Sequence, residues 1–268
     1  MMKLGKDKTR ERWSLLIFAV IAAAAVILDS LMIVVIAILF VLIAMINLQT
    51  KNFRKIRDKL QSSSMQSQNV TALYAFLKPE KPLPEFDGYT LTASKTVFLA
   101  DLIMDKKPGL IVELGSGIST IVGAYCLHKI GSGKIISFEG SEEYANITRN
   151  NLRKHGLEMY AEVIYVPIDD IDINGKNFRW YKIDKGVIDN KIDLLFVDGP
   201  VGESQKYARY PALPFFRDQL AADAVILLDD TDREEEQVIT QMWMAENPGL
   251  QQPGGHLRRD IFVGQFGK

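Results

Sequence analysis

The stretch that decides the fold is Ile111-Val112-Glu113-Leu114-Gly115-Ser116-Gly117-Ile118-Ser119-Thr120. It begins with apolar, partly β-branched residues, which are typical of a buried parallel strand. Two glycines follow, and the lack of a Cβ lets the backbone turn sharply and lets a ligand come close to it. Ser119 or Thr120 is then expected to cap a helix. The stretch therefore predicts a strand, a glycine turn and a helix, with Glu113 where the strand ends.

The charge of Glu113 indicates what kind of ligand the turn accepts. A dinucleotide site needs a third glycine for close helix packing and a free helix N-terminus for the pyrophosphate. Here Thr120 stands at the third-glycine position, and a carboxylate at Glu113 would repel phosphates. A cationic ligand fits better, and S-adenosylmethionine carries an ammonium and a sulfonium but no phosphate. The alternative is a glycine turn that binds nothing, because short glycine motifs are weak evidence.

Length and composition narrow the class of protein. The 268 residues can hold one α/β domain and an appendage. A net charge of −1 provides no basic field for nucleic acid, so no nucleic-acid partner is expected. The single cysteine, Cys126, excludes an internal disulfide framework and fits a small core residue better than a nucleophile.

The N-terminal region predicts a membrane anchor. A basic tail, residues 1–12, precedes an apolar segment, residues 13–47, that is interrupted by Asp29-Ser30. About 20 apolar residues already span a bilayer. Basic residues flank the segment on both sides, and such flanks prefer the cytoplasm, which favours a helical hairpin turning at Asp29. One long tilted helix, or a soluble helix that forms a homo-oligomer, are the alternatives.

Residues 48–69 are expected to connect this anchor to the rest of the chain. Residues 48–60 read as a basic amphipathic stalk, and the Ser- and Gln-rich residues 61–69 read as a flexible linker. The domain proper is expected over residues 70–268. The anchor predicts a location at the inner (cytoplasmic) membrane, with this domain facing the cytoplasm.

Apolar strands alternate with helices through the domain, which predicts an α/β fold with a doubly wound, mainly parallel, Rossmann-like sheet. An irregular polar stretch is expected at 169–190, between the third and fourth strands. The expected strands are 110–112, 134–138, 161–166, 192–197, 224–228 and 260–266, and the expected helices are 90–104, 141–155, 211–220 and 232–245.

Acidic residues follow four of these strands: Glu113, Glu139, Asp198 and Asp229, the last with Asp230 beside it. In a doubly wound sheet the carboxyl ends of the strands line one rim, where ligands bind. Glu139 lies about twenty residues beyond the glycines, where a carboxylate accepts the ribose hydroxyls of a nucleoside. Each acid could instead cap a helix. Together they predict a nucleoside site with additional carboxylates beside it.

The chain resembles the class I S-adenosylmethionine-dependent methyltransferases, in particular a bacterial subgroup that is membrane-tethered or free. The resemblance covers about residues 84–266 and rests on the "ELGSG" turn, "DLLFVDGP" (193–200), "ARYPALP" (208–214) and "LLDD" (227–230). It implies a seven-stranded sheet in which Glu113 and the glycine turn hold the methionyl part, Glu139 the ribose and the 167–169 turn the adenine. The implied cofactor-binding residues are Glu113, Gly115, Ser116, Gly117, Ser119, Glu139, Gly140, Ile168, Asp169 and Asp198.

The acceptor side of the rim leaves alternatives open. Asp198, Asp229 and Asp230 offer hard oxygen ligands for Mg²⁺ or Mn²⁺, as in the catechol-type O-methyltransferases that the site resembles. Those enzymes usually carry Asp-Asn after the fifth strand, whereas this chain has Asp229-Asp230. Asp198 as a metal-free general base, or a structural role for all three, are the alternatives. Further acceptor-binding candidates are Trp180, Tyr181, Arg209 and Tyr210, with core or surface packing as the alternative for each.

These observations predict a membrane-anchored methyltransferase (EC 2.1.1.-) that methylates a hydroxyl. The acceptor would be a small molecule, a glycan or a lipid-linked compound. A nucleotide-binding oxidoreductase, or a catalytically silent membrane scaffold with this fold, are the alternative functions.

Overall fold

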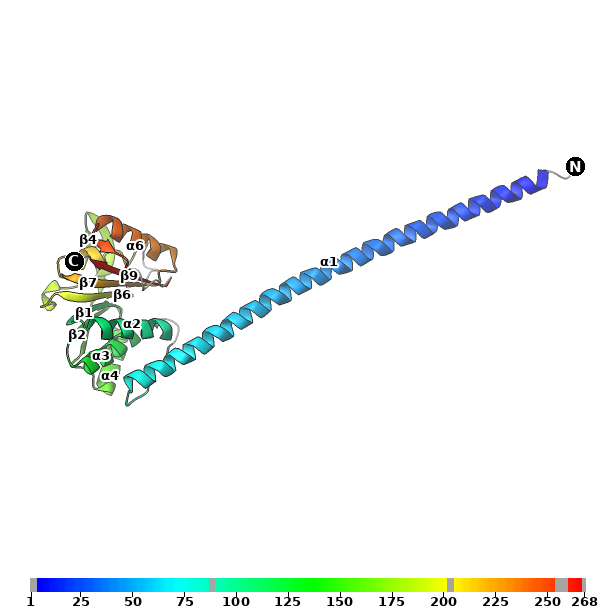
Figure 1. Ribbon diagram of the computed structural model, residues 1–268. Helices are drawn as coiled ribbons and strands as arrows, with labels where there is room; N and C mark the ends of the chain where they lie inside the picture. The colour runs from blue at the N-terminus through cyan, green and yellow to red at the C-terminus, as the bar shows by residue number, and fades with distance from the viewer. Residues whose placement is uncertain (1–3, 87–89, 202–204, 254–259, 267–268) are drawn as a thin grey trace. The chain divides into compact units, whose positions relative to one another are not determined.

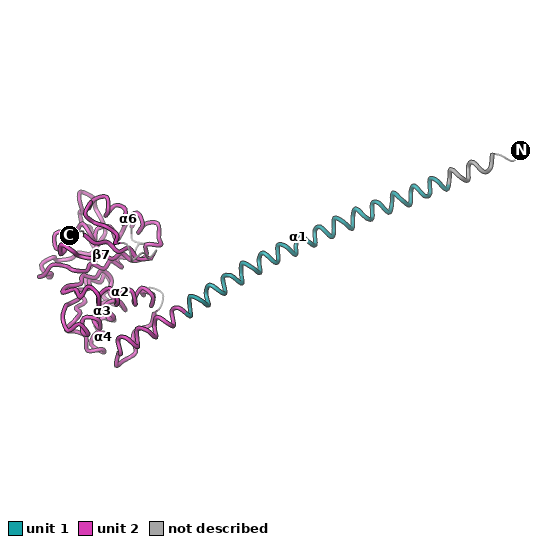
Figure 2. Tube along the Cα trace, in the orientation of Figure 1, with its two compact units in different colours: residues 1–64 teal, residues 65–268 magenta. Residues whose placement is uncertain are grey.

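The computed structural model describes residues 4–86, 90–201, 205–253 and 260–266, with side chains from residue 13 onward. The chain forms two compact units, residues 1–64 and residues 65–268 (Figure 2). The first unit consists of helix α1, Leu4–Leu77, whose last turns belong to the second unit.

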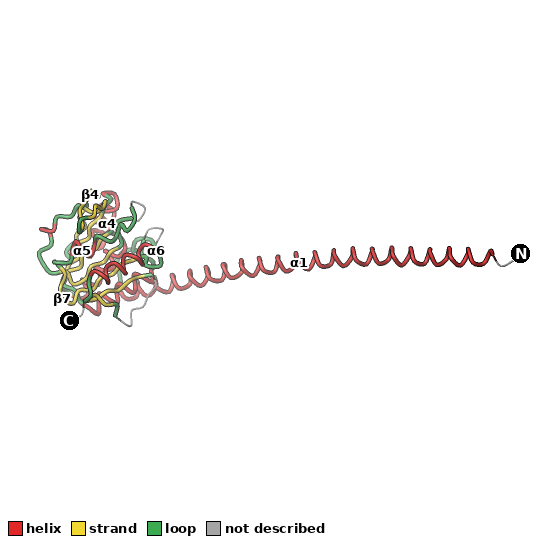
Figure 3. The backbone as a smooth tube through the Cα atoms, turned by 90° about the horizontal axis from the view of Figure 1, so that it is seen from above, coloured by secondary structure: helices red, strands yellow, loops and turns green. Residues whose placement is uncertain are grey.

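Helix α1 is continuous through Asp29-Ser30 (Figures 1 and 3), so the expected hairpin is wrong and the single-helix alternative is the one found. The Ser30 hydroxyl donates a hydrogen bond to the carbonyl of Ile27 at 2.8 Å, which satisfies it within the helix. The linker expected at 61–69 is also helical, because the segment contains no glycine or proline to end a helix.

The apolar part of α1 is fully exposed within the chain. Among the described helices, α1 is the one long and apolar enough to cross a membrane, and its most apolar window has a mean hydropathy of 3.2 with none of it buried. A core helix of this composition would be covered by other elements. An exposed apolar surface of this size needs a partner, either lipid or protein.

The second unit is built on a seven-stranded sheet with the order β3-β2-β1-β6-β7-β9-β8. Strands β3, β2, β1, β6 and β7 run parallel, and β9 is antiparallel to both β7 and β8. The strands are β1 Leu110–Leu114, β2 Lys134–Glu139, β3 Ala161–Tyr165, β6 Ile192–Val197, β7 Leu220–Asp229, β8 Leu250–Gln251 and β9 Ile261–Phe266. The predicted doubly wound, mainly parallel fold is confirmed.

Helices cover both faces of this sheet, because alternate strand residues point to opposite sides. On one face Ile111, Ile135 and Phe196 pack against α2, α3 and the last turns of α1, with α4 at the β3 edge. On the other face Val112, Phe138 and Leu195 pack against α5, α6 and the β4–β5 hairpin. The helices are α2 Ala93–Lys106, α3 Ile118–Ile130, α4 Glu142–His155, α5 Ala212–Phe216 and α6 Glu234–Glu246.

The stretch expected to be irregular contains a two-stranded antiparallel hairpin instead. Strand β4, Ile168–Ile173, pairs with β5, Lys176–Tyr181, and a short 3-10 helix, Lys185–Val187, follows. Asn174 and Gly175 form the turn with φ of 54° and 77°, the left-handed conformation that a two-residue hairpin requires. The hairpin places Trp180 and Tyr181 over the sheet, so its residues form part of the domain core.

Candidate functional site

The glycine turn between β1 and α3 approaches the end of β6 closely. Gly115 has φ of 92°, and a Cβ there would lie 3.2 Å from the carbonyl oxygen of Asp198. The Asp198 amide in turn donates to the carbonyl of Leu114 at 2.9 Å. Beside Gly117, in contrast, a Cβ would meet no described atom within 4 Å. The turn is therefore closed against β6 at Gly115 and leaves room for a ligand at Gly117.

Glu113 is linked to this turn through hydrogen bonds. Its carboxylate is 2% exposed and accepts a hydrogen bond from the Thr120 hydroxyl, whose oxygen accepts the Gly117 amide at 3.1 Å. Gly117, rather than Ser119 or Thr120, is therefore the N-cap of α3, which corrects the expected cap. Burial raises the pKa of Glu113 to about 7, although hydrogen bonds from Ser119 and Thr120 oppose the shift.

Glu139, at the end of β2, faces the same turn. One carboxylate oxygen accepts the Ser116 amide at 2.8 Å and the Ser116 hydroxyl at 3.1 Å, and the other accepts the Ser141 amide at 3.0 Å. Because both oxygens are held by donors of the surrounding loops, the carboxylate has a fixed direction and is only partly buried. It is therefore a preorganised acceptor for a pair of hydroxyl groups.

Tyr181 closes one side of this region. A Cβ at Gly140 would lie 3.2 Å from the Tyr181 ring and 3.3 Å from Ile168, and a Cβ at Gly199 would collide with the Tyr181 hydroxyl. Burial raises the pKa of Tyr181, and the charges of Glu139, Asp198 and Glu113 act on the same hydroxyl. Tyr181 therefore lies among the acidic residues of the turn, and a side chain at position 199 would require Tyr181 to move.

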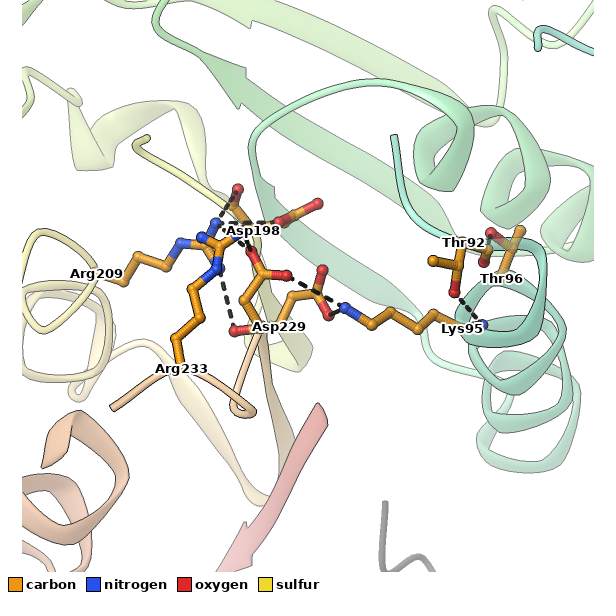
Figure 4. A network of polar contacts seen from close by, with 8 residues as sticks. Thr92, Lys95, Thr96, Asp198, Arg209, Asp229 and Arg233 are labelled. Carbon is orange, nitrogen blue, oxygen red and sulfur yellow. Dashed lines mark hydrogen bonds and ion pairs between the residues drawn. The ribbon is translucent and has the colours of Figure 1, made fainter. Parts of the chain in front are cut away.

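The acidic residues after β6 and β7 form a cluster. Carboxylate oxygens of Asp198, Asp229 and Asp230 all lie within 4.8 Å of one another. Lys95, from the first turn of α2, places its Nζ 2.6 Å from Asp229 and 3.3 Å from Asp230. Figure 4 shows Lys95 entering from the α2 side, opposite Arg209 and Arg233. The acids are therefore enclosed between cations from separate elements.

Arg209 holds the other side of the cluster and is only 4% exposed. Its Nη2 lies 3.3 Å from the Asp198 carboxylate and 3.1 Å from that of Asp230, and its guanidinium donates to the carbonyls of Asp229 and Asp198 at 3.1 and 3.2 Å. Arg233 adds a third cation, 3.0 Å from Asp230. Arg209 thus ties the ends of β6 and β7 together.

The three carboxyl groups of the cluster differ in acidity. Burial raises the pKa of Asp198 well above its usual range, although Arg209 opposes the shift. Burial also raises the pKa of Asp229 despite its pair with Lys95. For Asp230 burial acts upward as well, but Arg209, Lys95 and Arg233 outweigh it and lower the pKa. Asp230 is thus the firmest anion of the three, whereas burial favours the protonated form of Asp198 and Asp229.

Comparison with known proteins agrees with this geometry. A family model described as a methyltransferase domain matches residues 112–231, from β1 through the glycine turn to the acids after β7. The part of the chain that carries the sequence motifs therefore resembles a methyltransferase domain, and the expected methyltransferase fold is confirmed.

Individual relatives of the methyltransferase domain are distant. A protein-L-isoaspartate O-methyltransferase of Methanopyrus kandleri is 33% identical over 88 residues, which are 32% of this chain and 38% of that protein. The SAH-bound methyltransferase PaMTH1 of Podospora anserina is similar in structure, with a TM-score of 0.54, 15% identity and coverage of 78% of this chain and 94% of that one. Cofactor-bound Rv0187 from MTB has a TM-score of 0.50, 20% identity and coverage of 74% and 89%.

The methyltransferase domain brings most of the predicted site residues to one rim. Gly115, Ser116, Gly117, Glu139, Gly140, Ile168 and Asp198 all border the turn or its neighbours, and Tyr181, predicted as an acceptor residue, lies beside Gly140 and Gly199. Ser119 is buried in the first turn of α3. Asp169 is exposed on β4, where an ion pair with Lys182 at 2.7 Å lowers its pKa.

Two predicted acceptor residues lie elsewhere. Trp180 is fully buried against Phe215 and Phe216, because β5 turns it into the core. Tyr210 is 2% exposed, and its hydroxyl donates to Glu246 at the end of α6. Both are packing residues. Arg209 is buried in the acid cluster, which makes it a counterion within the domain instead of an exposed acceptor contact.

Sequence reasoning missed Lys95 as a site residue. The lysine follows Thr92, whose side chain caps α2 by accepting the Lys95 amide. A helix start before the first strand was expected, but the sequence carries no signal that its first turn reaches the end of β7. That contact depends on how α2 packs against the sheet.

Proposed function

We propose that this chain is an S-adenosylmethionine-dependent O-methyltransferase. The observation that carries the proposal is the pairing, at one rim, of the fixed Glu139 carboxylate with the open side of the glycine turn at Gly117. The donor's two ribose hydroxyls would bind the partly exposed Glu139 carboxylate, which Ser116 and Ser141 hold in a fixed direction. The turn would hold the methionyl part, above the buried Glu113.

S-adenosylmethionine supplies an electrophilic methyl group on a positively charged sulfur. The chain's own residues must then orient the acceptor, exclude water and take up a proton. Asp198 suits the last role, because its pKa is raised and its side chain is 21% exposed, more than those of Asp229 and Asp230. Asp198 would take up the acceptor's hydroxyl proton as the methyl group passes from the donor's sulfur to the acceptor oxygen.

Arg209 supports this step through Asp198. Its guanidinium lies 3.3 Å from the Asp198 carboxylate and is itself fixed by two backbone carbonyls, so it holds the base in one direction. Such fixed orientation removes part of the entropy barrier of the transfer.

The apolar helix suggests where this reaction takes place. Residues 13–47 would anchor the chain in the inner (cytoplasmic) membrane, and the methyltransferase domain would face the cytoplasm, where the donor is made. The exposed apolar surface of α1 supports this part of the proposal. A membrane-bound enzyme meets a lipid-linked, glycan or small-molecule acceptor, and the hydroxyl is the group we expect to be methylated.

The test is transfer of a labelled methyl group from S-adenosylmethionine. The full chain in detergent is incubated with this donor and with fractionated membrane and soluble extracts. We expect label in a hydroxyl-bearing acceptor, and loss of most transfer in Asp198→Asn. Binding of S-adenosylhomocysteine without methyl transfer to any fraction would contradict catalysis and favour the silent scaffold. Binding of NAD without binding of either sulfur ligand would favour the oxidoreductase.

A further inference from the structure

The acid cluster has the composition of a divalent metal site. Its oxygens lie within 4.8 Å of one another, and carboxylates are the ligands that Mg²⁺ and Mn²⁺ prefer. Whether a metal fits depends on what these oxygens already contact.

The contacts show that the carboxylates have partners within the chain. Asp229 offers Oδ1 to Lys95, Asp230 offers Oδ1 to Lys95 and Oδ2 to Arg209 and Arg233, and Asp198 offers Oδ1 to Arg209. The three carboxyl groups thus face three positive charges. A divalent ion would have to displace these cations or add two charges to a site that already holds three.

Two of the cations have little freedom to leave. Lys95 is 7% exposed and its shortest ion pair, to Asp229, measures 2.6 Å. Arg209 is fixed by two backbone carbonyls besides its carboxylates. A buried ammonium or guanidinium that loses its carboxylate keeps its charge away from water, which is strongly unfavourable. The residues present therefore do not fit a divalent ion.

We propose that Lys95 and Arg209 take the place of a metal ion in this cluster. Lys95 is a positioning residue: it links the first turn of α2 to Asp229 and Asp230 and keeps divalent cations out. Asp230 sits in the left-handed region, with φ of 61°, so the turn after β7 benefits from such a restraint. The proposal concerns ion binding and does not depend on the methyl-transfer activity.

Mn²⁺ binding to the full chain in detergent, followed by electron paramagnetic resonance, tests the proposal without donor or acceptor. Wild type is expected to leave Mn²⁺ free up to millimolar concentration. Lys95→Met removes the charge with little change of volume and frees Oδ1 of Asp229 and of Asp230. It should raise Mn²⁺ affinity at least about tenfold, equivalent to about 1.4 kcal/mol.

Lys134→Met is the matched control. Lys134 also makes a 2.6 Å pair with a carboxylate, Glu162, but on the surface and away from the cluster, so its loss should leave Mn²⁺ affinity unchanged. Lys95→Gln serves as a second variant if Lys95→Met folds poorly. Micromolar Mn²⁺ binding by wild type that Asp229→Asn abolishes would overturn the proposal. Unchanged affinity in both folded Lys95 variants would also overturn it, because the lysine would then not be what excludes the ion.

Discussion

The buried carboxyl group of Glu113 gives the sharpest stability prediction. Its pKa is raised from 4.5 to about 7 because the side chain is almost fully buried. The folded state thus keeps a proton that the unfolded chain releases above its own pKa. Stability is therefore lost as pH rises from the unfolded pKa to the folded one, and the loss amounts to about 3 kcal/mol at 1.36 kcal/mol per pKa unit.

Glu113→Gln removes this titration and keeps an oxygen that accepts from Thr120. The difference in unfolding free energy between variant and wild type should therefore shift by about 3 kcal/mol in favour of the variant between pH about 4.5 and about 8. Any fixed packing difference cancels between the two pH values. Other titrating acids, such as Asp198, are present in both proteins and cancel as well.

Urea unfolding of the full chain in detergent, followed by tryptophan fluorescence, measures this difference. Trp180 and Trp243 are fully buried in the second unit and report on its unfolding, whereas Trp13 lies exposed in the first. Glu158→Gln is the control, because the Glu158 side chain is 58% exposed. Parallel pH profiles of Glu113→Gln and wild type would refute the argument from burial.

Two further predictions concern packing at the rim. Arg209→Met should lower the unfolding free energy by about 3–5 kcal/mol in urea titrations, since buried carboxylates lose their partner, while the exposed Arg153→Met should change it by less than about 0.5 kcal/mol. Stability unchanged by Arg209→Met would contradict its role as a counterion. Gly199→Ala should cost about 1–3 kcal/mol by thermal unfolding through its clash with the Tyr181 hydroxyl, and adding Tyr181→Phe should recover part of the loss. Additive losses in the double variant would show that the clash is not the cause.

The strands and the acids behind them could be predicted from the sequence because both signals are local. Each central strand is a short apolar run. Glu113 lies one residue before the end of β1, Glu139 and Asp229 end β2 and β7, and Asp198 directly follows β6. Parallel strands then bring these ends to one rim, whatever the helices do. That is why the gathering of these acids at one rim could be predicted from the chain alone.

The β4–β5 hairpin was missed although its signal is present. Ile171 and Ile173 alternate with aspartates in the second half of β4, and Asn174-Gly175 is the strongest short hairpin signal. The acidic character of the stretch hid the alternation. Because the hairpin was missed, Trp180 was expected at the acceptor site, whereas it lies in the core.

The continuous α1 shows how weakly two polar residues interrupt an apolar helix. Asp29 and Ser30 are not helix breakers, and the Ser30 hydroxyl finds a partner one turn back. Basic flanks on both sides suggested two crossings, but they do not determine local backbone structure. Which side of the membrane each end of this single helix faces stays a prediction.

Lys95 marks the limit of sequence reasoning at this site. Clustered carboxylates call for positive charge, and a bound metal was the simplest source. The structure supplies the charge from α2, which precedes β1 in the chain by only a few residues yet reaches the end of β7. Only the packing of the helix on the sheet reveals that contact.

Calorimetry of S-adenosylhomocysteine binding to the full chain is the decisive measurement for the proposed cofactor site. We expect binding to one site per chain, weakened about tenfold or more by Glu139→Gln, which loses charge-assisted bonds to the ribose hydroxyls. Glu142→Gln, in the exposed first turn of α4, should bind like wild type. No binding of S-adenosylhomocysteine, or equal affinity in Glu139→Gln and wild type, would contradict the account.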